Sequence, residues 1–310
     1  MTTYYNNNTI LYHDGRCVRA VDACMDFYSQ SLHYGYSVFE GIRSYRQADG
    51  TTRIFKAKEH YERLQASAAA LHLPYTWTVD ALIEVTYELL RQNQLQDAYI
   101  RPLVYAPANM TFQQNDIAHL VIAVWPMQPF LGERLLRVMT SSYRRPNPEA
   151  FHIEAKASGH YVNSILASQQ AKANGYDEAL LLDVQGYVAE GPGANLFFEK
   201  DGVLFTPAAG NILPGITRAT VLELCAINNI EVKEVRAGLD EVKQADAAFY
   251  CGTAAEIVGF ERLDDYVFPK PWSETISAQL QQAYKQLVSG NSRGIFRQES
   301  TIVNETSTIA

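Results

Sequence analysis

The spacing of apolar residues predicts strands and two helices in the first part of the chain. Short apolar runs flank Asp14-Gly15, a dipeptide that favours a tight turn, and predict a β-hairpin. Residues 58–73 and 79–95 carry apolar side chains three or four positions apart, as amphipathic helices do. We therefore expect a β-rich start followed by two amphipathic helices.

Proline and β-branched residues mark two further strands and a domain boundary. Residues 99–107 and 119–126 are short, rich in β-branched or aromatic side chains and bounded by proline, which favours strands. Prolines and a glycine then cluster in an apolar loop, so we expect an interdomain linker at 127–136. The domains are then a small one over 1–126 and a larger one over 137–310.

The second half of the chain mixes helices with hairpins. Helical spacing covers 161–173, and turns at Gln185-Gly186 and Asp201-Gly202 predict two hairpins. A helix with a capping hydroxyl is expected over 217–228, and a closing helix over 272–288. Because the strands form hairpins and do not alternate strictly with helices, the pattern indicates an α+β fold and not a doubly wound parallel sheet.

Composition narrows the class of protein. The 310 residues, 47% of them apolar and 19% charged, can bury a substantial core. Twenty-six basic and 34 acidic side chains give a net charge of −8 without a basic cluster, so nucleic acid is not an expected partner. The start lacks a signal-like stretch, and no run reaches the ~18 to 20 apolar residues of a membrane helix. We expect a soluble, cytoplasmic protein without a membrane partner.

Neither cysteines nor histidines indicate a metal site or a disulfide frame. The seven histidines are scattered, and no C-x-x-C pair occurs. Four buried free thiols are expected, at Cys17, Cys24, Cys225 and Cys251. The chain also lacks H-E-x-x-H, G-x-S-x-G and G-x-x-x-x-G-K-[ST], and has no G-x-G-x-x-G after a strand, which excludes several common reaction centres.

Lys156 and two later residues suggest an aldehyde cofactor. A lone lysine is usually solvated, and Glu190, at the end of a predicted hairpin strand, is by itself an ordinary surface acid. Tyr161, however, follows the lysine by five positions, and Gly-rich turns follow further on. An aldehyde on a pyridine ring needs an amine as nucleophile and proton carrier, a phenol near the ring oxygen, and a carboxylate that keeps the ring nitrogen protonated.

Two later segments can bind an anion. Gly215, Ile216 and Thr217 begin a predicted helix, whose free N–H groups attract phosphate, although Thr217 can equally be a plain helix cap. Thr253 follows Gly252 at the end of a predicted strand. It can add a hydroxyl and amides for the same anion or for a substrate carboxylate.

Six motifs occur in the order found in one enzyme family. They are YGYSVFEGIRSY at 34–45, AYIRPL at 98–103, EAKASGHYVNS at 154–164, EGPGANLF at 190–197, LPGITR at 213–218 and CGTAAE at 251–256. Over residues 10–288 the chain resembles the branched-chain amino acid aminotransferases, class IV, fold-type IV enzymes that use pyridoxal 5′-phosphate. The resemblance implies a fold like that of D-amino acid aminotransferase, with a small N-terminal α/β domain and a larger C-terminal domain on a mixed, barrel-like sheet.

The same resemblance implies the cofactor residues. Lys156 is implied to be the Schiff-base lysine and catalytic residue, with Tyr161 on the ring hydroxyl and Glu190 facing the pyridine nitrogen. Arg63 resembles the family's phosphate-binding arginine, whose planar guanidinium can donate two parallel hydrogen bonds. The remaining cofactor residues are Leu213 on the ring and Gly215, Ile216, Thr217 and Thr253 at the phosphate.

The resemblance also implies the substrate residues, which are Tyr34, Phe39, Gly41, Tyr99, Arg101, Phe130, Thr253 and Ala254. Amides of Thr253 and Ala254 are implied to hold the substrate carboxylate. Arg101 shares a strand face with Tyr99, and in similar enzymes this arginine can meet the side-chain carboxylate of glutamate. One apolar pocket then accepts leucine-like substrates and glutamate.

Some residues depart from the family pattern. His160 stands where asparagine is common, Pro192 where a small residue is usual, and Phe130 where some relatives have tyrosine. None of these changes removes a catalytic group. The segment 105–117 matches no pattern, and in related dimers this region reaches toward the neighbouring subunit's pocket, so we expect a homodimer or higher homo-oligomer.

The expected activity is transfer of the amino group of leucine, isoleucine or valine to 2-oxoglutarate, by a ping-pong mechanism that gives the 2-oxo acid and L-glutamate. D-amino acid aminotransferase and aminodeoxychorismate lyase share the lysine, the glutamate and the phosphate turn, while EGIR and YIRP favour the branched-chain activity. A catalytically silent binding protein is the alternative from another class. The intact set of Lys156, Tyr161 and Glu190 argues against it.

Overall fold

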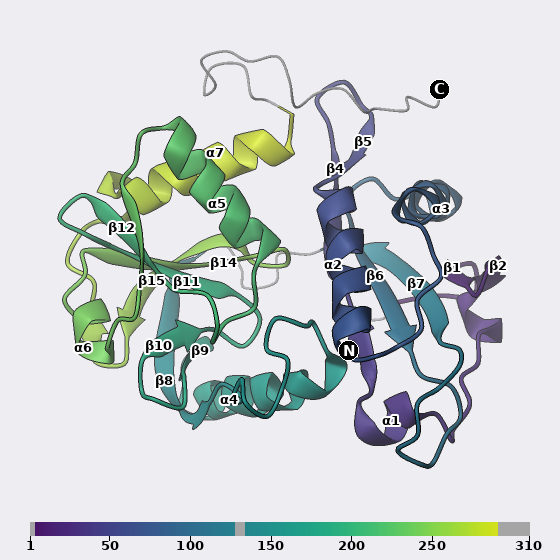
Figure 1. Cartoon of the computed structure of the whole chain (residues 1–310). Coiled ribbons are helices and arrows are strands. Elements are labelled where there is room, and N and C mark those ends of the chain that lie inside the picture. The colour runs from purple at the N-terminus through teal and green to yellow at the C-terminus, as the bar shows by residue number, and fades with distance from the viewer. Residues whose placement is uncertain (1–3, 128–133, 291–310) are drawn as a thin grey trace.

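The computed structural model describes residues 4–127 and 134–290, which build two β-sheets with helices around them (Figure 1). Most of the predicted linker 127–136, with Phe130, lies outside these residues. The α+β architecture expected from the hairpins is confirmed. Within the described ranges, no helix combines the length and apolarity needed to cross a membrane.

The first sheet has seven strands in the order β2-β1-β7-β6-β4-β5, with β3 paired to β6. The strands are β1 (Ile10–His13), β2 (Arg16–Arg19), β3 (Ser37–Phe39), β4 (Ile42–Arg46), β5 (Thr52–Ile54), β6 (Ala98–Tyr105) and β7 (His119–Pro126). The hairpin at Asp14-Gly15 is confirmed, since both residues have the positive φ, 46° and 87°, that such a two-residue turn requires.

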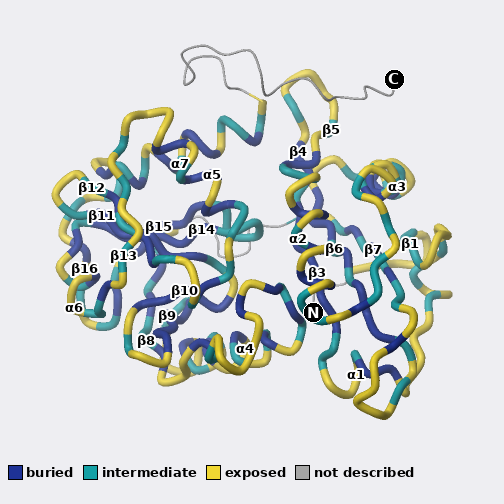
Figure 2. The backbone as a smooth tube through the Cα atoms, in the orientation of Figure 1, coloured by how far each residue is buried: buried dark blue, intermediate teal, exposed yellow. Residues whose placement is uncertain are grey.

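Helices α2 (Ala57–Ala70) and α3 (Val79–Gln92) cover this sheet as their apolar spacing predicts. The short helix α1 (Gln30–Tyr34) was not predicted. Leu64 of α2 and Leu89 of α3 are fully buried in one core with Ile100 of β6. Figure 2 shows the buried residues concentrated along the strands and on the inward faces of the helices.

The second sheet has nine strands in the order β10-β9-β8-β15-β14-β11-β12-β13, with β16 on β15. The strands are β8 (Leu136–Arg144), β9 (Glu178–Leu182), β10 (Val188–Glu190), β11 (Asn195–Lys200), β12 (Val203–Pro207), β13 (Val232–Val235), β14 (Ala247–Gly252), β15 (Glu256–Leu263) and β16 (Tyr266–Val267). Because β10 also pairs with β11, the six strands β8, β9, β10, β11, β14 and β15 close into a barrel. β8 runs parallel to β9 and β15, so the expected mixed, barrel-like sheet is confirmed.

The helices of this second part are α4 (Tyr161–Ala173), α5 (Ile216–Ile227), α6 (Leu239–Val242) and α7 (Ile276–Val288). The helix predicted over 161–173 and both hairpins are confirmed. The two parts of the chain share a core, because Phe55 beside β5 packs edge-on against Tyr284 of α7, with ring centres 5.8 Å apart. The site described below lies where these two parts meet.

Two expectations about helix boundaries are wrong. Thr217 does not cap α5, since the chain is still extended at Gly215 and turns helical at Ile216, which places Thr217 inside the first turn. The closing helix is not continuous over 272–288, because a 3₁₀ turn covers Trp272–Glu274 and α7 begins at Ile276, where the side chain of Thr275 caps it by accepting from the Ala278 amide. Both boundaries depend on how the chain enters the helix.

Two of the four cysteines were also placed wrongly. Cys225 and Cys251 are buried, but Cys17 and Cys24 are exposed. Cys17 lies on β2, the edge strand of the first sheet, where no further strand covers it among the described residues. Burial raises the pKa of the Cys251 thiol, which keeps it protonated.

Candidate active site

Lys156 lies on a segment between β8 and α4 that is held against the first sheet by backbone hydrogen bonds. Its carbonyl accepts from the Phe39 amide at 3.1 Å, and its amide donates to Ser67 Oγ of α2 at 3.0 Å. The next residue, Ala157, forms a β-bridge with Val38 of β3. The lysine is thus fixed where the two parts of the chain meet.

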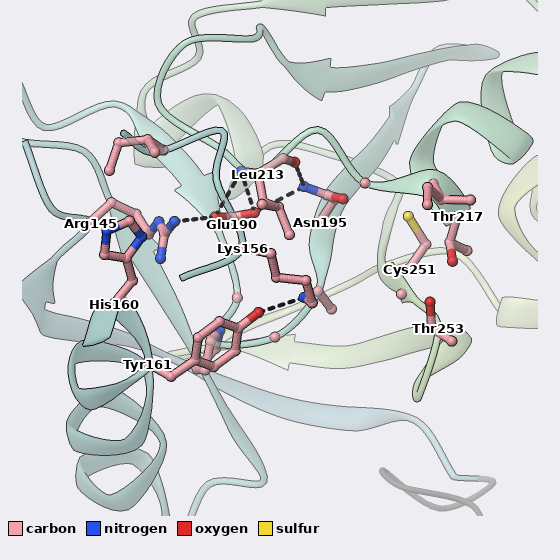
Figure 3. Close-up of a pocket in the computed structure, with 18 of the residues that line it drawn as sticks. Arg145, Lys156, His160, Tyr161, Glu190, Asn195, Leu213, Thr217, Cys251 and Thr253 are labelled. Carbon is pink, nitrogen blue, oxygen red and sulfur yellow. Dashed lines mark hydrogen bonds and ion pairs between the residues drawn. The ribbon is translucent and has the colours of Figure 1, made fainter. Parts of the chain in front are cut away.

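The amine of Lys156 points toward the phenol of Tyr161 (Figure 3), and Nζ donates to the phenol oxygen at 2.7 Å. A short 3₁₀ turn, Ser158–His160, separates the two residues and leads into α4, whose first residue is Tyr161. The ring of Phe39 lies edge-on to Tyr161, with ring centres 4.7 Å apart, and 5.1 Å from Nζ. An apolar ring therefore borders the amine and the phenol.

Glu190, the last residue of β10, is a buried carboxyl group with donors of different kinds. Arg145 Nη2 forms an ion pair with Oε1 at 2.9 Å, and the Leu213 amide donates to Oε1 at 3.2 Å. Burial raises the pKa of the Glu190 carboxyl, while the Arg145 charge and the Leu213 amide limit that rise. The carboxyl group can therefore share a proton with a base placed beside it.

Asn195 links this carboxyl group to the turn that precedes α5. Its Nδ2 donates to Glu190 Oε2 at 2.9 Å and to the Leu213 carbonyl at 3.0 Å. A Cβ on Gly215 would overlap the side-chain oxygen of Asn195, so this close approach requires glycine. The Glu190 carboxyl group and the turn that leads into α5 are thus joined in one hydrogen-bonded unit.

The N-terminus of α5 offers groups that can bind an anion. The first amides of a helix have no acceptor within the helix, and the helix dipole adds partial positive charge there. Thr217 of α5 and Thr253 after β14 bring two hydroxyl groups to the same pocket. Arg63 reaches this turn from α2, and its Nη1 donates to the Pro214 carbonyl at 2.9 Å.

These groups line one pocket that is partly open to solvent. The structure brings together every residue predicted to hold the cofactor, namely Arg63, Lys156, Tyr161, Glu190, Leu213, Gly215, Ile216, Thr217 and Thr253. An amine, a phenol, a buried carboxyl group and an anion site are the groups that a phosphorylated pyridine aldehyde needs around it.

Predicted substrate residues lie next to the amine. Arg101 Nη2 donates to the Tyr99 phenol at 3.1 Å, and the guanidinium lies 4.6 Å from the centre of the Phe39 ring, the same ring that borders Lys156. A Cβ on Gly41 would overlap the Tyr99 phenol, so glycine makes room for this ring. The result is an aromatic wall that carries one cation.

The other predicted substrate residues are placed differently. Tyr34 is 47% exposed and packs against Phe112, with ring centres 5.6 Å apart. Of the predicted substrate residues, Thr253 lines the pocket described above, whereas the lining does not include Tyr34, Phe39, Gly41, Tyr99, Arg101 or Ala254. Ala254 follows Thr253 in the half-buried turn before β15. Phe130 lies outside the described residues.

The two unusual residues at the pocket are compatible with its chemistry. His160 and Pro192 both line it. The His160 ring packs edge-on against Phe151, with ring centres 5.2 Å apart. Burial and the neighbouring Arg145 charge lower the pKa of His160, so it adds no charge at neutral pH.

Sequence reasoning missed the partners that hold these groups. Arg145 follows another arginine and looks like a surface cation, yet it is 6% exposed and paired with Glu190. Asn195, which binds Glu190, and Glu40, which binds Arg63, lie within the motifs EGPGANLF and EGIR. These motifs were the only signal in the sequence that could have pointed to the two residues. No local pattern marks Arg145, because its partner comes from another strand.

Comparisons with known proteins agree with this geometry. The sequence profile of the amino-transferase class IV family matches residues 37–263. The branched-chain-amino-acid aminotransferase of Pseudomonas aeruginosa is 39% identical over 287 residues, which cover 91% of this chain and 93% of that protein.

Two solved structures are also similar. The branched-chain amino acid aminotransferase of Escherichia coli has a TM-score of 0.88 and 35% identity, with 94% of this chain and 99% of that chain covered. The enzyme of the same name from Thermobaculum terrenum, solved in its PLP form, has a TM-score of 0.86 and 35% identity, with 93% and 96% covered.

Proposed function

We propose that this chain, which belongs to the class IV aminotransferase family, moves the amino group of leucine, isoleucine or valine to 2-oxoglutarate. The family resemblance stated from the six motifs is confirmed by the profile match and by relatives at 37–39% identity over most of the chain. The observation that carries the activity is the hydrogen bond of 2.7 Å between Lys156 and Tyr161, at the centre of a pocket with a buried carboxyl group at one end and an anion site at the other.

The cofactor proposed for this pocket is pyridoxal 5′-phosphate, because the residues that line the pocket have the functional groups that this molecule needs. When bound, it supplies an aldehyde that condenses with amines and a ring that accepts electrons from the bond being broken. Arg63, Thr217, Thr253 and the first amides of α5 would hold its phosphate, and Leu213 would pack on its ring. The PLP form of the Thermobaculum terrenum enzyme supports this proposal.

Lys156 acts in two ways in the proposed reaction. Its Nζ would hold the aldehyde of the cofactor at rest, and as a free amine it would be the base that moves the α-proton of the substrate. The Tyr161 phenol orients this amine through the hydrogen bond that the two share. Both half-reactions use the same amine, which fits a ping-pong sequence.

Glu190 holds the proton on the ring nitrogen. Its carboxyl group is buried, so its negative charge would act strongly on a cation beside it, and a protonated ring nitrogen would in turn favour the ionised form of the acid. Arg145 and Asn195 keep this carboxyl group in place. The other end of the reaction, binding of the substrate carboxylate, falls to the amides of Thr253 and Ala254.

Arg101 and its aromatic neighbours select the substrate. Phe39 and Tyr99 offer apolar surface to a branched side chain, with Gly41 leaving room for the tyrosine ring. The guanidinium of Arg101 is close enough to the same surface to bind the side-chain carboxylate of glutamate. Both substrate classes can therefore use one pocket.

Exposed apolar side chains support a homodimer. Phe27, Leu32 and Phe112 are 79%, 55% and 93% exposed, and Tyr34 packs on Phe112. Such a patch is typical of an interface. A second copy seated there would cover Tyr34, one of the predicted substrate residues, so Tyr34 and Phe130 are proposed to complete the pocket in the assembled enzyme. The cytoplasmic location stays a prediction of the sequence.

Trapping the cofactor tests the proposal. Borohydride reduction of the holoprotein should leave a pyridoxyl group on the peptide that contains Lys156, detected by mass spectrometry. Lys156→Ala should lower leucine-to-2-oxoglutarate transfer by at least about 1000-fold, because nucleophile and proton carrier are lost together. Lys172→Ala, on the exposed face of α4, is the control and should leave the rate unchanged. A tag on another peptide, or none, would refute the assignment.

A panel of amino donors separates the alternatives. We expect turnover of the L-enantiomers of leucine, isoleucine and valine. Preference for D-amino acids would indicate a D-amino acid aminotransferase, and release of pyruvate from aminodeoxychorismate would indicate the lyase. Protein that stays colourless after cofactor is added would indicate a silent binding protein.

A further inference from the structure

Behind Arg63 lies a buried acid that the proposed reaction does not use. Glu40, between β3 and β4, has no exposed surface. Its Oε1 accepts from Arg63 Nε at 2.7 Å, and its Oε2 accepts from Arg63 Nη2 at 2.9 Å. His60 Nδ1 lies 2.7 Å from the same Oε2. We propose that Glu40 and His60 are positioning residues that hold the Arg63 guanidinium in the orientation that binds the cofactor phosphate, an inference that rests on the proposed function.

The cluster is built on one face of α2. His60 and Arg63 are three positions apart, so both side chains project toward Glu40. Ser67, four positions beyond Arg63, lies on the same face and accepts from the Lys156 amide. A single helix face therefore supports both the phosphate arginine and the backbone of the catalytic lysine.

Burial and neighbouring charges determine the protonation states of Glu40 and His60. Burial alone acts to raise the pKa of Glu40, but the Arg63 and His60 contacts outweigh it and hold the pKa well below its usual range. Burial lowers the pKa of His60, so its ring is neutral at pH 7. An ionised carboxylate only accepts hydrogen bonds, and the His60 proton must therefore be on Nδ1.

The arginine still has donors for a ligand. A guanidinium has five N–H groups, and in the described residues three of them meet protein acceptors, two at Glu40 and one at the Pro214 carbonyl. The two remaining N–H groups belong to a side chain that lines the pocket with Thr217 and Thr253. Glu40 thus fixes one edge of the guanidinium and leaves its end for an anion.

The negative charge of Glu40 makes it possible to distinguish a residue that positions Arg63 from one that attracts the phosphate. A carboxylate beside a cation lowers the positive charge that a phosphate meets, so an electrostatic clamp alone would bind phosphate better without it. A flexible arginine side chain, however, loses rotamer freedom when it binds, and a fixed bidentate partner removes that cost beforehand. The two effects predict opposite results for neutralisation of Glu40.

The test compares two cofactors in the full-length protein, freed of cofactor and then titrated by absorbance with pyridoxal phosphate or with pyridoxal, which lacks the phosphate. Glu40→Gln should weaken binding of pyridoxal phosphate at least about tenfold and change that of pyridoxal less than about twofold. Glu59→Gln, an exposed acid on the same helix, should change neither. Unchanged or tighter binding of pyridoxal phosphate to Glu40→Gln, or equal weakening of both compounds, would overturn the proposal.

A second pair of variants covers the case in which Glu40→Gln does not fold, as judged by circular dichroism. His60→Leu removes the donor to Oε2, whereas His60→Asn keeps an amide donor close to the position of Nδ1. We expect selective loss of pyridoxal phosphate binding in the first and its recovery in the second. Equal binding of pyridoxal phosphate by His60→Leu and His60→Asn would overturn the role of His60. If Glu40→Gln does not fold, the same result would overturn the whole proposal. If the parent protein binds neither compound through Lys156, the proposed function itself fails.

Discussion

The two ends of the pocket each place a buried acid beside an arginine, but the pairs have opposite electrostatic character. Glu40 accepts two hydrogen bonds from Arg63 and one from His60, and its pKa is held far below the usual range. Glu190 has one contact to Arg145, and burial raises its pKa. The number of charged donors decides whether a buried carboxyl group is a fixed anion or a group that can share a proton.

This difference fits the chemistry proposed at each end. A phosphate carries its own charge and needs a cation in a fixed orientation, which a permanently ionised partner provides. A pyridine nitrogen stays protonated beside an acid that can accept its N–H, and Glu190, with one charged partner, keeps acceptor capacity for it.

Replacement of Arg145, the partner of Glu190, should lower the free energy of unfolding the most. Arg145→Leu leaves Glu190 buried without its ion-pair partner, and the free energy of unfolding at pH 7 should fall by about 3 kcal/mol. The loss should shrink as pH falls, because Glu190, whose pKa is already raised, then becomes neutral. Urea unfolding measures both values.

Arg91→Leu is the control for this change. Arg91 forms an exposed ion pair with Glu88 on α3, so its replacement should change the free energy of unfolding by less than about 0.5 kcal/mol. A similar loss in the two variants would contradict the role given to Arg145.

Glu190→Gln should act on the reaction and little on the fold. The amide cannot hold the ring proton, so removal of the α-proton should slow by about 10- to 100-fold, followed by stopped-flow absorbance with leucine. Glu178→Gln is a matched control, because Glu178 is also buried with a raised pKa but does not line the pocket. Equal rates in the parent and Glu190→Gln would rule out this role.

Arg101→Leu should change selectivity by about tenfold, since a carboxylate loses its cation while an apolar side chain does not. The kcat/KM for glutamate and 2-oxoglutarate should fall relative to that for leucine. Arg46→Leu, at an exposed position of β4, serves as control. Equal losses for the two substrate classes would disprove selection by Arg101.

The smallest effect concerns acid stability. Because the pKa of Glu40 is lower in the folded chain than in the unfolded chain, its ionised form stabilises the fold above about pH 4.5, and this stabilisation is lost as pH falls. Glu190 has the reverse sign, since its raised pKa makes folding more favourable once pH falls through it. Glu40→Gln should therefore lower stability at pH 7 more than at pH 3, by about 1 kcal/mol, as measured by urea unfolding at both pH values. A difference that is absent or reversed would contradict the low pKa.

Local elements were predictable because their causes lie within a few residues. Turn residues with positive φ produced the hairpin at Asp14-Gly15, and apolar spacing located α4 over Tyr161–Ala173. Where a boundary depends on how the chain enters a helix, prediction was less accurate, as with Thr217 and with Thr275, the cap of α7. The residues predicted to hold a cofactor line one pocket, because motifs preserve residue types even where their contacts are unknown.

The chemical groups, such as the amine of Lys156, the phenol of Tyr161 and the acid of Glu190, and many of the elements that carry them could be recognised from the sequence alone. The fold places Arg145 against Glu190 and Glu40 behind Arg63, and it leaves Tyr34 exposed and outside the pocket lining of its own chain. The physical reason is that the energy of a charge depends on burial and on its partners, and residues distant in sequence supply both.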